Sequence, residues 1–235
     1  MGMMFFDPTY LIFMLPAIAL MILAQLYVSS AYRKWSQVPA RSRMTGSDAA
    51  RYLMRRNGLM GLRLESIDGQ MTDHYDPSQK VLRLSQDVAS AGSVASLAIA
   101  AHELGHAMQD QTGYLPMRLR AFMVPAVNIG STLGWVMIVA GLLLRVTGLA
   151  WLGILVFSAG ALFALATLPV ELNASARAKQ MLTDSGIITG ADERRGVNTV
   201  LNAAALTYVA ALATSLLQLL YWVSVVGGMG GRRRN

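Results

Sequence analysis

The chain is organised around residues 100–108, which read Ala-Ala-His-Glu-Leu-Gly-His-Ala-Met. The sequence contains three histidines, and two of them, His102 and His106, stand in this stretch. In a helix, residues four apart lie one turn apart on the same face, so both imidazoles can reach one metal ion. Glu103 can then take a proton from a water activated by that ion. The stretch therefore predicts a Zn²⁺ hydrolase site, rather than a soluble helix with two incidental histidines.

The composition is that of a membrane protein. Of the 235 residues, 54% are hydrophobic and only 14% are charged, whereas soluble domains carry about 25% charged residues. Four stretches lack Asp, Glu, Lys and Arg and are long enough to cross a bilayer as helices, namely residues 8–32, 121–144, 146–170 and 196–231. We therefore expect a mainly α membrane protein with about four transmembrane helices and a small α+β zincin-like portion.

Charge and cysteine content narrow the function further. The net charge of +7 has a source in basic residues that flank the apolar stretches, so it does not indicate a nucleic-acid partner. The chain has no cysteine, which excludes disulfides and thiolate ligands. A metal site must therefore use histidines and carboxylates.

The order of polar and apolar stretches predicts five segments and a multi-pass topology. Residues 33–120 hold 12 basic against 8 acidic residues, which places this segment and its active site on the cytoplasmic side. The first apolar stretch has no basic residues before it and no evident cleavage site after it, so we expect a retained anchor. The segments are an N-terminal anchor (1–32), a cytoplasmic portion with the motif helix (33–120), a transmembrane hairpin (121–170), a cytoplasmic helix (171–200), and a last transmembrane helix with a basic tail (201–235).

The polar portion contains signals for two helices and two strands. Thr45 is a good N-cap for a helix that ends at Asn57 and Gly58, and Ser93 can cap a motif helix that reaches Gln111. Between them, residues 62–84 predict a short β-hairpin or meander with a turn at residues 76–79. Such strands could hold an extended peptide substrate at a sheet edge, or could merely cover the motif helix.

A catalytic zinc ion commonly has three protein ligands, so one is still needed. The candidates are Asp110, His74, Glu171 and the other acidic residues of the cytoplasmic segments. Asp110 follows His106 by four residues on the same helix, which gives poor tetrahedral geometry. The hairpin at residues 121–170 returns the chain to the side on which it began, so Glu171 emerges beside the motif helix. We favour Glu171 as the third ligand over an ordinary solvated helix end.

The combination of a first span, His-Glu-x-x-His, a membrane hairpin and a Glu-bearing helix resembles the HtpX-like and CAAX prenyl endopeptidases, which are integral-membrane zinc gluzincins. Their second motif, Glu-x-x-Ala-Asp-x-x-Ala, corresponds to Glu171, Ala174, Ser175 and Ala178. Ser175 replaces the Asp, which in that family supports a zinc-ligand histidine. The resemblance implies that Ser175, or the nearby Asn173, would have to take over this support.

A closer resemblance is to the YugP-like neutral zinc metallopeptidases of bacteria. It rests on four motifs, at Phe5 to Tyr10, Thr72 to Pro77, Ala101 to Ala107, and Leu168 to Leu172, where Leu172 replaces a Phe. The resemblance covers nearly the whole chain. It implies a zinc-dependent metallopeptidase in the bacterial inner membrane.

These observations predict a zinc metalloendopeptidase whose substrates are peptides or membrane proteins. His102, His106 and Glu171 would hold Zn²⁺, and Glu103 would act as general base on the zinc-activated water. His74 or Tyr75 could stabilise the oxyanion, or both could be structural residues beside a turn. The alternatives are a hydrolase of lipid amide or ester bonds, and a membrane scaffold or partner-binding protein with a degenerate zinc site. No charged residue lies within the predicted spans to support a transporter.

Overall fold

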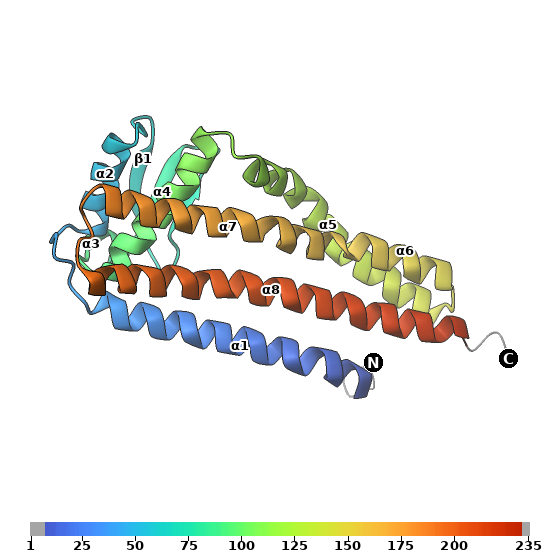
Figure 1. Ribbon diagram of the computed structural model, residues 1–235. Helices are drawn as coiled ribbons and strands as arrows, with labels where there is room; N and C mark the ends of the chain where they lie inside the picture. Colours follow the sequence, from blue (N-terminus) through green and yellow to red (C-terminus); the bar gives the residue numbers. More distant parts are fainter. Residues whose placement is uncertain (1–7, 232–235) are drawn as a thin grey trace. The chain divides into compact units, whose positions relative to one another are not determined.

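The computed structural model describes residues 8–231 and is mainly helical (Figure 1). Phe5 to Asp7 of the N-terminal motif and the basic tail at Arg232 to Arg234 lie outside the described residues. The elements in chain order are α1 (Pro8–Ser36), α2 (Gly46–Arg56), β1 (Arg63–Ile67), β2 (His74–Asp76), β3 (Val81–Ser85), α3 (Gln86–Ser90), α4 (Val94–Gln111), α5 (Leu115–Leu143), α6 (Thr147–Phe157), α7 (Ala159–Asp184) and α8 (Ala191–Gly231).

Four helical segments of the described chain are long and apolar enough to cross a membrane. The expectation of about four such helices is therefore confirmed. The third segment is divided by a turn at Ser158 into α6 and α7, a break that the uninterrupted apolar pattern did not indicate. The four segments are Pro8–Ser36, Leu115–Leu143, Thr147–Asp184 and Ala191–Gly228.

The chain divides into two compact units, and four long helices of the described residues extend through both. The first unit comprises the residues up to Ala24, Arg118–Leu168, and those from Thr207 onward; the second comprises Gln25–Met117 and Pro169–Leu206. In consequence α1, α5, α7 and α8 each begin in one unit and end in the other. All the candidate site residues belong to the second unit.

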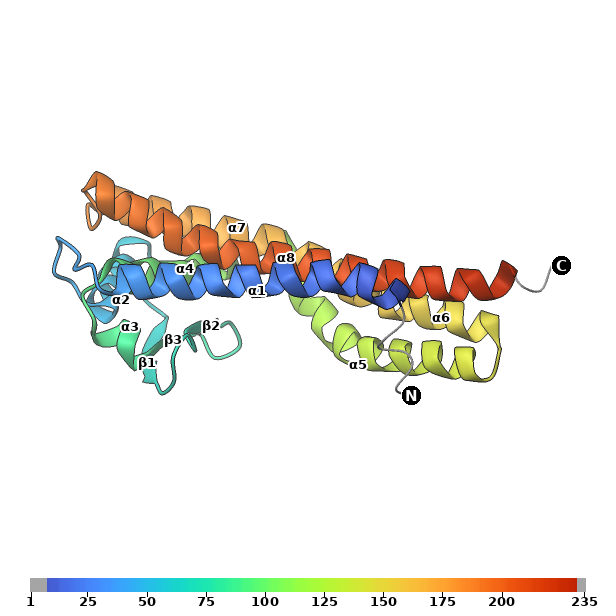
Figure 2. The same ribbon diagram turned by 90° about the horizontal axis from the view of Figure 1, so that it is seen from below.

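In the first unit, α5 and α6 form a tightly packed helical hairpin (Figure 2). A Cβ added at Gly141 would lie 2.5 Å from the backbone nitrogen of Ala150, and one at Gly134 would lie 2.6 Å from that of Phe157. Glycine at these positions lets the two backbones approach closely, which is the usual means of helix association in lipid.

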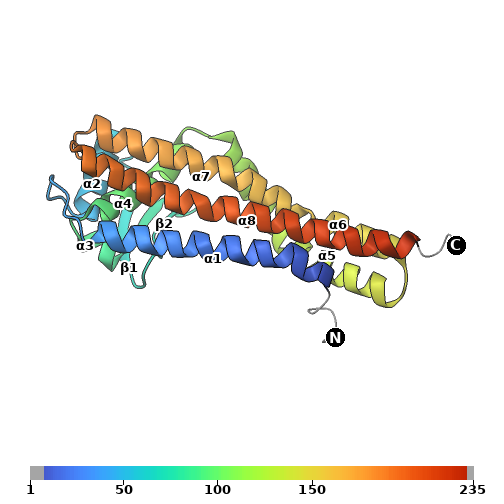
Figure 3. The ribbon, with the colours of Figure 1, turned by 60° about the horizontal axis from the view of Figure 1, so that its bottom comes forward.

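In the second unit, α4 lies between the small sheet and the α7 residues of that unit (Figure 2). Its apolar stripe at Val94, Leu97, Ala98 and Ala101 is fully buried in the main core cluster. The α1 and α8 residues of this unit run side by side and pack through Val28, Ala31 and Ala203 (Figure 3). The helix that carries the motif is thus the central element of the unit.

The two predicted helix starts are confirmed. Thr45 and Asp48 form a capping box at the start of α2, and the Ser93 side chain accepts a hydrogen bond from Ser96 N at the start of α4. Gly58 after α2 and Gly113 after α4 have φ of +70° and +63°, a conformation that glycine adopts without strain.

The sheet has three strands in the order β1-β3-β2. The two strands expected near residues 62–67 and 81–84 are present as β1 and β3, but they pair parallel, with Leu64 opposite Leu82, so neither a hairpin nor a meander of these two strands is correct. The antiparallel hairpin around the predicted turn at residues 76–79 is formed instead by β2 and β3, with Tyr75 opposite Leu82. The buried β3 occupies the centre and leaves β2 at an edge.

Candidate metal centre

The site forms where α4 and α7 come into close contact at Gly105. A Cβ added at Gly105 would lie 2.5 Å from the carbonyl oxygen of Ala174 on α7. His102 precedes Gly105 by three residues, and Glu171 precedes Ala174 by three residues. The same contact therefore brings one turn of each helix together and places Glu171 against the histidines.

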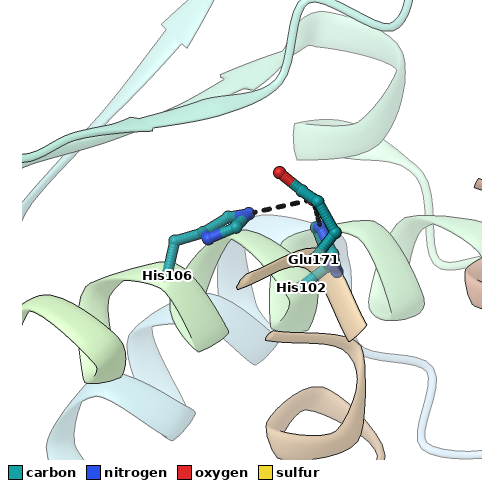
Figure 4. Close-up of side chains that lie close together, drawn as sticks. All are labelled: His102, His106 and Glu171. Carbon is teal, nitrogen blue, oxygen red and sulfur yellow. Dashed lines mark hydrogen bonds and ion pairs between the residues drawn. The ribbon is translucent and has the colours of Figure 1, made fainter. Parts of the chain in front are cut away.

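The side chains of His102, His106 and Glu171 converge on one point (Figure 4). Glu171 Oε2 lies 3.3 Å from His102 Nε2 and 3.5 Å from His106 Nε2. The potential ligand atoms of the three residues all lie within 4.8 Å of one another. Glu171 is 2% exposed, so this carboxylate is withdrawn from water and faces the two imidazoles.

The Nδ1 nitrogen of each histidine, on the side of the ring away from Glu171, contacts a polar side chain. His102 Nδ1 lies 3.2 Å from Ser175 Oγ, and His106 Nδ1 lies 3.0 Å from Gln109 Oε1. A proton on Nδ1 satisfies both contacts and leaves Nε2 with a free lone pair facing Glu171. Ser175 thus occupies the supporting position next to His102, whereas the Asn173 side chain accepts hydrogen bonds from Gln109 and Arg177.

Gln109 is a site residue that the sequence reasoning missed. Its side chain is fully buried, and its Nε2 donates to the carbonyl of Val170 at 2.7 Å and to Asn173 Oδ1 at 3.0 Å. Gln109 therefore ties His106 to the α7 backbone next to Glu171. Its position three residues after His106 on the same helix was a usable signal, whereas its partners on α7 were not visible in the sequence.

Glu103 lies half-buried on α4 and receives a hydrogen bond from the backbone N–H of Tyr75, with 3.1 Å between the nitrogen and Oε2. Burial raises the pKa of Glu103, and the charges of Glu171 and Asp73 add to the rise while the two histidines oppose it. A carboxylate with a raised pKa is a stronger base. Glu103 thus meets the chemical requirement for accepting a proton.

The other candidates lie elsewhere in the site region. Asp110 accepts hydrogen bonds from the Tyr75 hydroxyl and from Lys80. Burial, and then the contact with Asp110, raises the pKa of Tyr75 above its ordinary value, so its hydroxyl keeps a proton that is directed to Asp110. His74 is exposed, with Nδ1 2.8 Å from the Thr72 carbonyl and Nε2 3.4 Å from Arg83. Among the described residues, neither Asp110 nor His74 joins the metal-ligand group.

The donor set fits Zn²⁺. Two imidazole nitrogens and a carboxylate oxygen are the ligands of many zinc enzymes, with bonds of about 2.0–2.2 Å. In a tetrahedron with such bonds, neighbouring ligand atoms lie about 3.3–3.5 Å apart. The separations of 3.3 Å and 3.5 Å to Glu171 Oε2 match this edge length. The three side chains can therefore hold zinc without rearrangement of α4 against α7.

Comparison with known proteins points to the same chemistry. Residues 10–227 match the family described as "Putative neutral zinc metallopeptidase". The chain is 44% identical over 219 residues to a protein of Bacillus subtilis (strain 168) named "Putative membrane protease YugP", and the alignment covers 93% of this chain and 96% of that protein. No solved structure matches the chain.

Proposed function

The chain belongs to the family of "Putative neutral zinc metallopeptidases", and from this premise we propose that it is a membrane endopeptidase that uses zinc to hydrolyse peptide bonds. His102, His106 and Glu171 are the proposed ligands, which makes the protein a gluzincin. The observation that carries the proposal is the convergence of these three side chains from α4 and α7. Zn²⁺ bound there would supply Lewis acidity toward water and toward the substrate carbonyl.

Glu103 is the proposed general base. It would take the proton of the attacking water and then give it to the leaving amine nitrogen. Its raised pKa favours the first transfer, and the Tyr75 N–H holds one carboxylate oxygen in place. The Tyr75 hydroxyl is already bonded to Asp110, so we propose that Tyr75 contributes to the site chiefly through its backbone.

We further propose that β2 holds the substrate in extended form. Among the described strands β2 pairs with β3 alone, and the Tyr75 N–H points away from β3 toward Glu103 on α4. The edge of β2 opposite β3 therefore faces the helix that carries the base. An extended peptide at this edge would form main-chain hydrogen bonds while its scissile bond lay near Glu103.

The proposed location is the cytoplasmic side of the membrane, in a multi-pass protein that acts on peptides or membrane proteins. The excess of basic residues in segment 33–120 supports this orientation. Four helices of membrane-crossing length support the multi-pass topology. The scaffold alternative predicts instead a protein without stoichiometric zinc, so metal analysis of the purified chain separates the two.

The decisive experiment compares the native protein with Glu103→Gln. The variant should bind zinc as the native protein does and lose at least about a hundredfold in cleavage, because general-base catalysis contributes about 10²–10⁴-fold. Cleavage can be followed on detergent-solubilised membrane proteins with both preparations at equal zinc content. Undiminished cleavage by the variant would refute Glu103 as the base.

A further inference from the structure

A groove of about 270 Å³ lies within the second unit, beside the candidate site. Its walls come from the loop after α2, from Tyr75 of β2 and from Ala107 of α4. Pockets that take drug-sized ligands measure about 300–1,000 Å³. The groove is therefore sized for a single large side chain rather than for a whole small molecule.

The walls are apolar and firmly supported. Leu59 and Ala107 are 6% and 3% exposed and belong to the main core cluster. Leu62 and Tyr75 are partly buried and pack against the same cluster. Because interiors are close-packed, residues anchored in this way keep the shape of the groove fixed.

The charges at the groove are already paired with each other. Lys80 and Asp110 are the two charged side chains among the described residues that line it, and they form an ion pair. Asp110 also accepts the hydrogen bond from the Tyr75 hydroxyl at 2.5 Å. A charged occupant would find no free partner here and would lose its hydration, whereas an apolar occupant would gain by burial.

The groove shares α4 and Tyr75 with the surroundings of the proposed base, Glu103. Ala107 follows His106 directly and lies four residues after Glu103, one turn of about 5.4 Å along the same face of α4. Tyr75 lines the groove, while the backbone N–H of the same residue donates a hydrogen bond to Glu103. An extended peptide advances about 3.3 Å per residue. A side chain one or two positions from a bond held at Glu103 therefore reaches the groove.

From this geometry we propose that the groove is a specificity pocket for a bulky apolar side chain, one or two residues from the scissile bond. The substrate class is then peptide segments with Leu, Met or Phe beside the bond that is cleaved. This inference rests on the proposed peptidase function and adds to it the chemical character of the substrate.

The test is to fill the groove with a larger side chain on the loop that follows α2. Gly61 lines the groove, and a Cβ placed there has no atom within 4 Å, so Gly61→Phe can add a ring without displacing the backbone. The full-length, zinc-loaded protein in detergent is given peptides that differ only in Leu, Phe, Ser or Asp next to the scissile bond. We expect kcat/KM to be at least about tenfold higher for Leu and Phe, and Gly61→Phe to abolish that preference.

Met60→Phe is the matched control, because Met60 is the neighbouring residue, is 70% exposed and does not line the groove. It should keep the native preference, and both variants should keep native zinc content and Tm. Cleavage without an apolar preference, or a preference that survives Gly61→Phe, overturns the specificity pocket and leaves the peptidase function standing.

If the native protein cleaves none of the peptides, the proposed function fails, and binding of the same fluorescent peptides decides the groove separately. Tighter binding of the Leu and Phe peptides that is lost in Gly61→Phe supports the groove as a binding site for apolar side chains. Equal binding of the Leu and Asp peptides, or no binding of any, overturns it.

Discussion

The two helices that build the site, α4 and α7, contribute to it in different ways. α4 supplies His102 and His106 from one local motif, so helix geometry alone places both imidazoles on one face. α7 supplies Glu171, whose position depends on how closely α7 approaches α4 at Gly105 and on the bond from Gln109 to its backbone. The two histidines are positioned by local sequence, and the proposed third ligand is positioned by the packing of α7 on α4. Substitution of a histidine should therefore remove zinc binding directly, whereas substitutions in the packing between α4 and α7 should weaken it indirectly.

Loss of an α4 histidine should have the largest effect. We expect His102→Ala and His106→Ala to abolish stoichiometric zinc binding and cleavage, because two remaining ligands hold Zn²⁺ poorly. His74→Ala is the control for zinc content, since His74 is exposed and bonded to Thr72 and Arg83. Metal analysis of the purified variants measures the effect. Full zinc content in either α4 variant would contradict the local specification of the site.

A substitution at the contact between α4 and α7 should have the second-largest effect. The Cβ of Gly105→Ala would meet the Ala174 carbonyl at 2.5 Å and push α7 away, at a cost of about 1–3 kcal/mol in the free energy of unfolding. Zinc affinity should fall with it, although all three ligands remain. Gly61→Ala is the control, because a Cβ there meets nothing within 4 Å. Unchanged Tm and zinc affinity in Gly105→Ala would show that the contact does not position Glu171.

The link from Gln109 should have a moderate effect. Gln109→Leu leaves the Val170 carbonyl and His106 Nδ1 without their partner, and loss of such supporting bonds lowers metal affinity by about 10–100-fold. Gln111→Leu, two residues further on the same helix and exposed, should change nothing in this measurement. A zinc titration against a competing chelator gives both affinities. Native affinity in Gln109→Leu would remove Gln109 from the site.

The smallest effect should be at Ser175. Its contact with His102 Nδ1 is a neutral one at 3.2 Å, so Ser175→Ala should lower zinc affinity by about tenfold or less. Ser175→Asp should raise the affinity, because a carboxylate accepts a stronger hydrogen bond from the same N–H. The same chelator titration ranks the two variants against the native protein. A higher zinc affinity in Ser175→Ala than in Ser175→Asp would show that residue 175 does not orient the ring of His102.

Much of the fold could be predicted because its signals are local. The caps at Thr45 and Ser93 and the long uncharged stretches specify helix starts and membrane-length helices from neighbouring residues alone. The parallel pairing of β1 with β3 could not be predicted in this way. The three-residue strand β2 carries too little pattern to be recognised, and without it residues 62–84 resemble a simple hairpin.

The candidate site, like the fold, has residues that the sequence indicates and residues whose roles depend on packing. Glu171 could be inferred because the apolar hairpin that precedes it constrains the path of the chain, and the structure places it with the two histidines. The roles of Gln109 and of the Tyr75 N–H could not be predicted, because each depends on a hydrogen bond to or from the backbone, which has no signature in the sequence. The groove beside Ala107 could not be predicted either, because it is lined by segments that meet only in the folded unit.

The central claim is that Glu171 completes a zinc site begun by His102 and His106. It is tested most directly by the zinc affinity of the purified full-length protein and of Glu171→Ala, with Glu103→Gln as the reference for a nearby carboxylate that is not a ligand. We predict one zinc per chain in the native protein and in Glu103→Gln, and at least about a hundredfold weaker binding in Glu171→Ala. Equal affinity in all three proteins would contradict the claim.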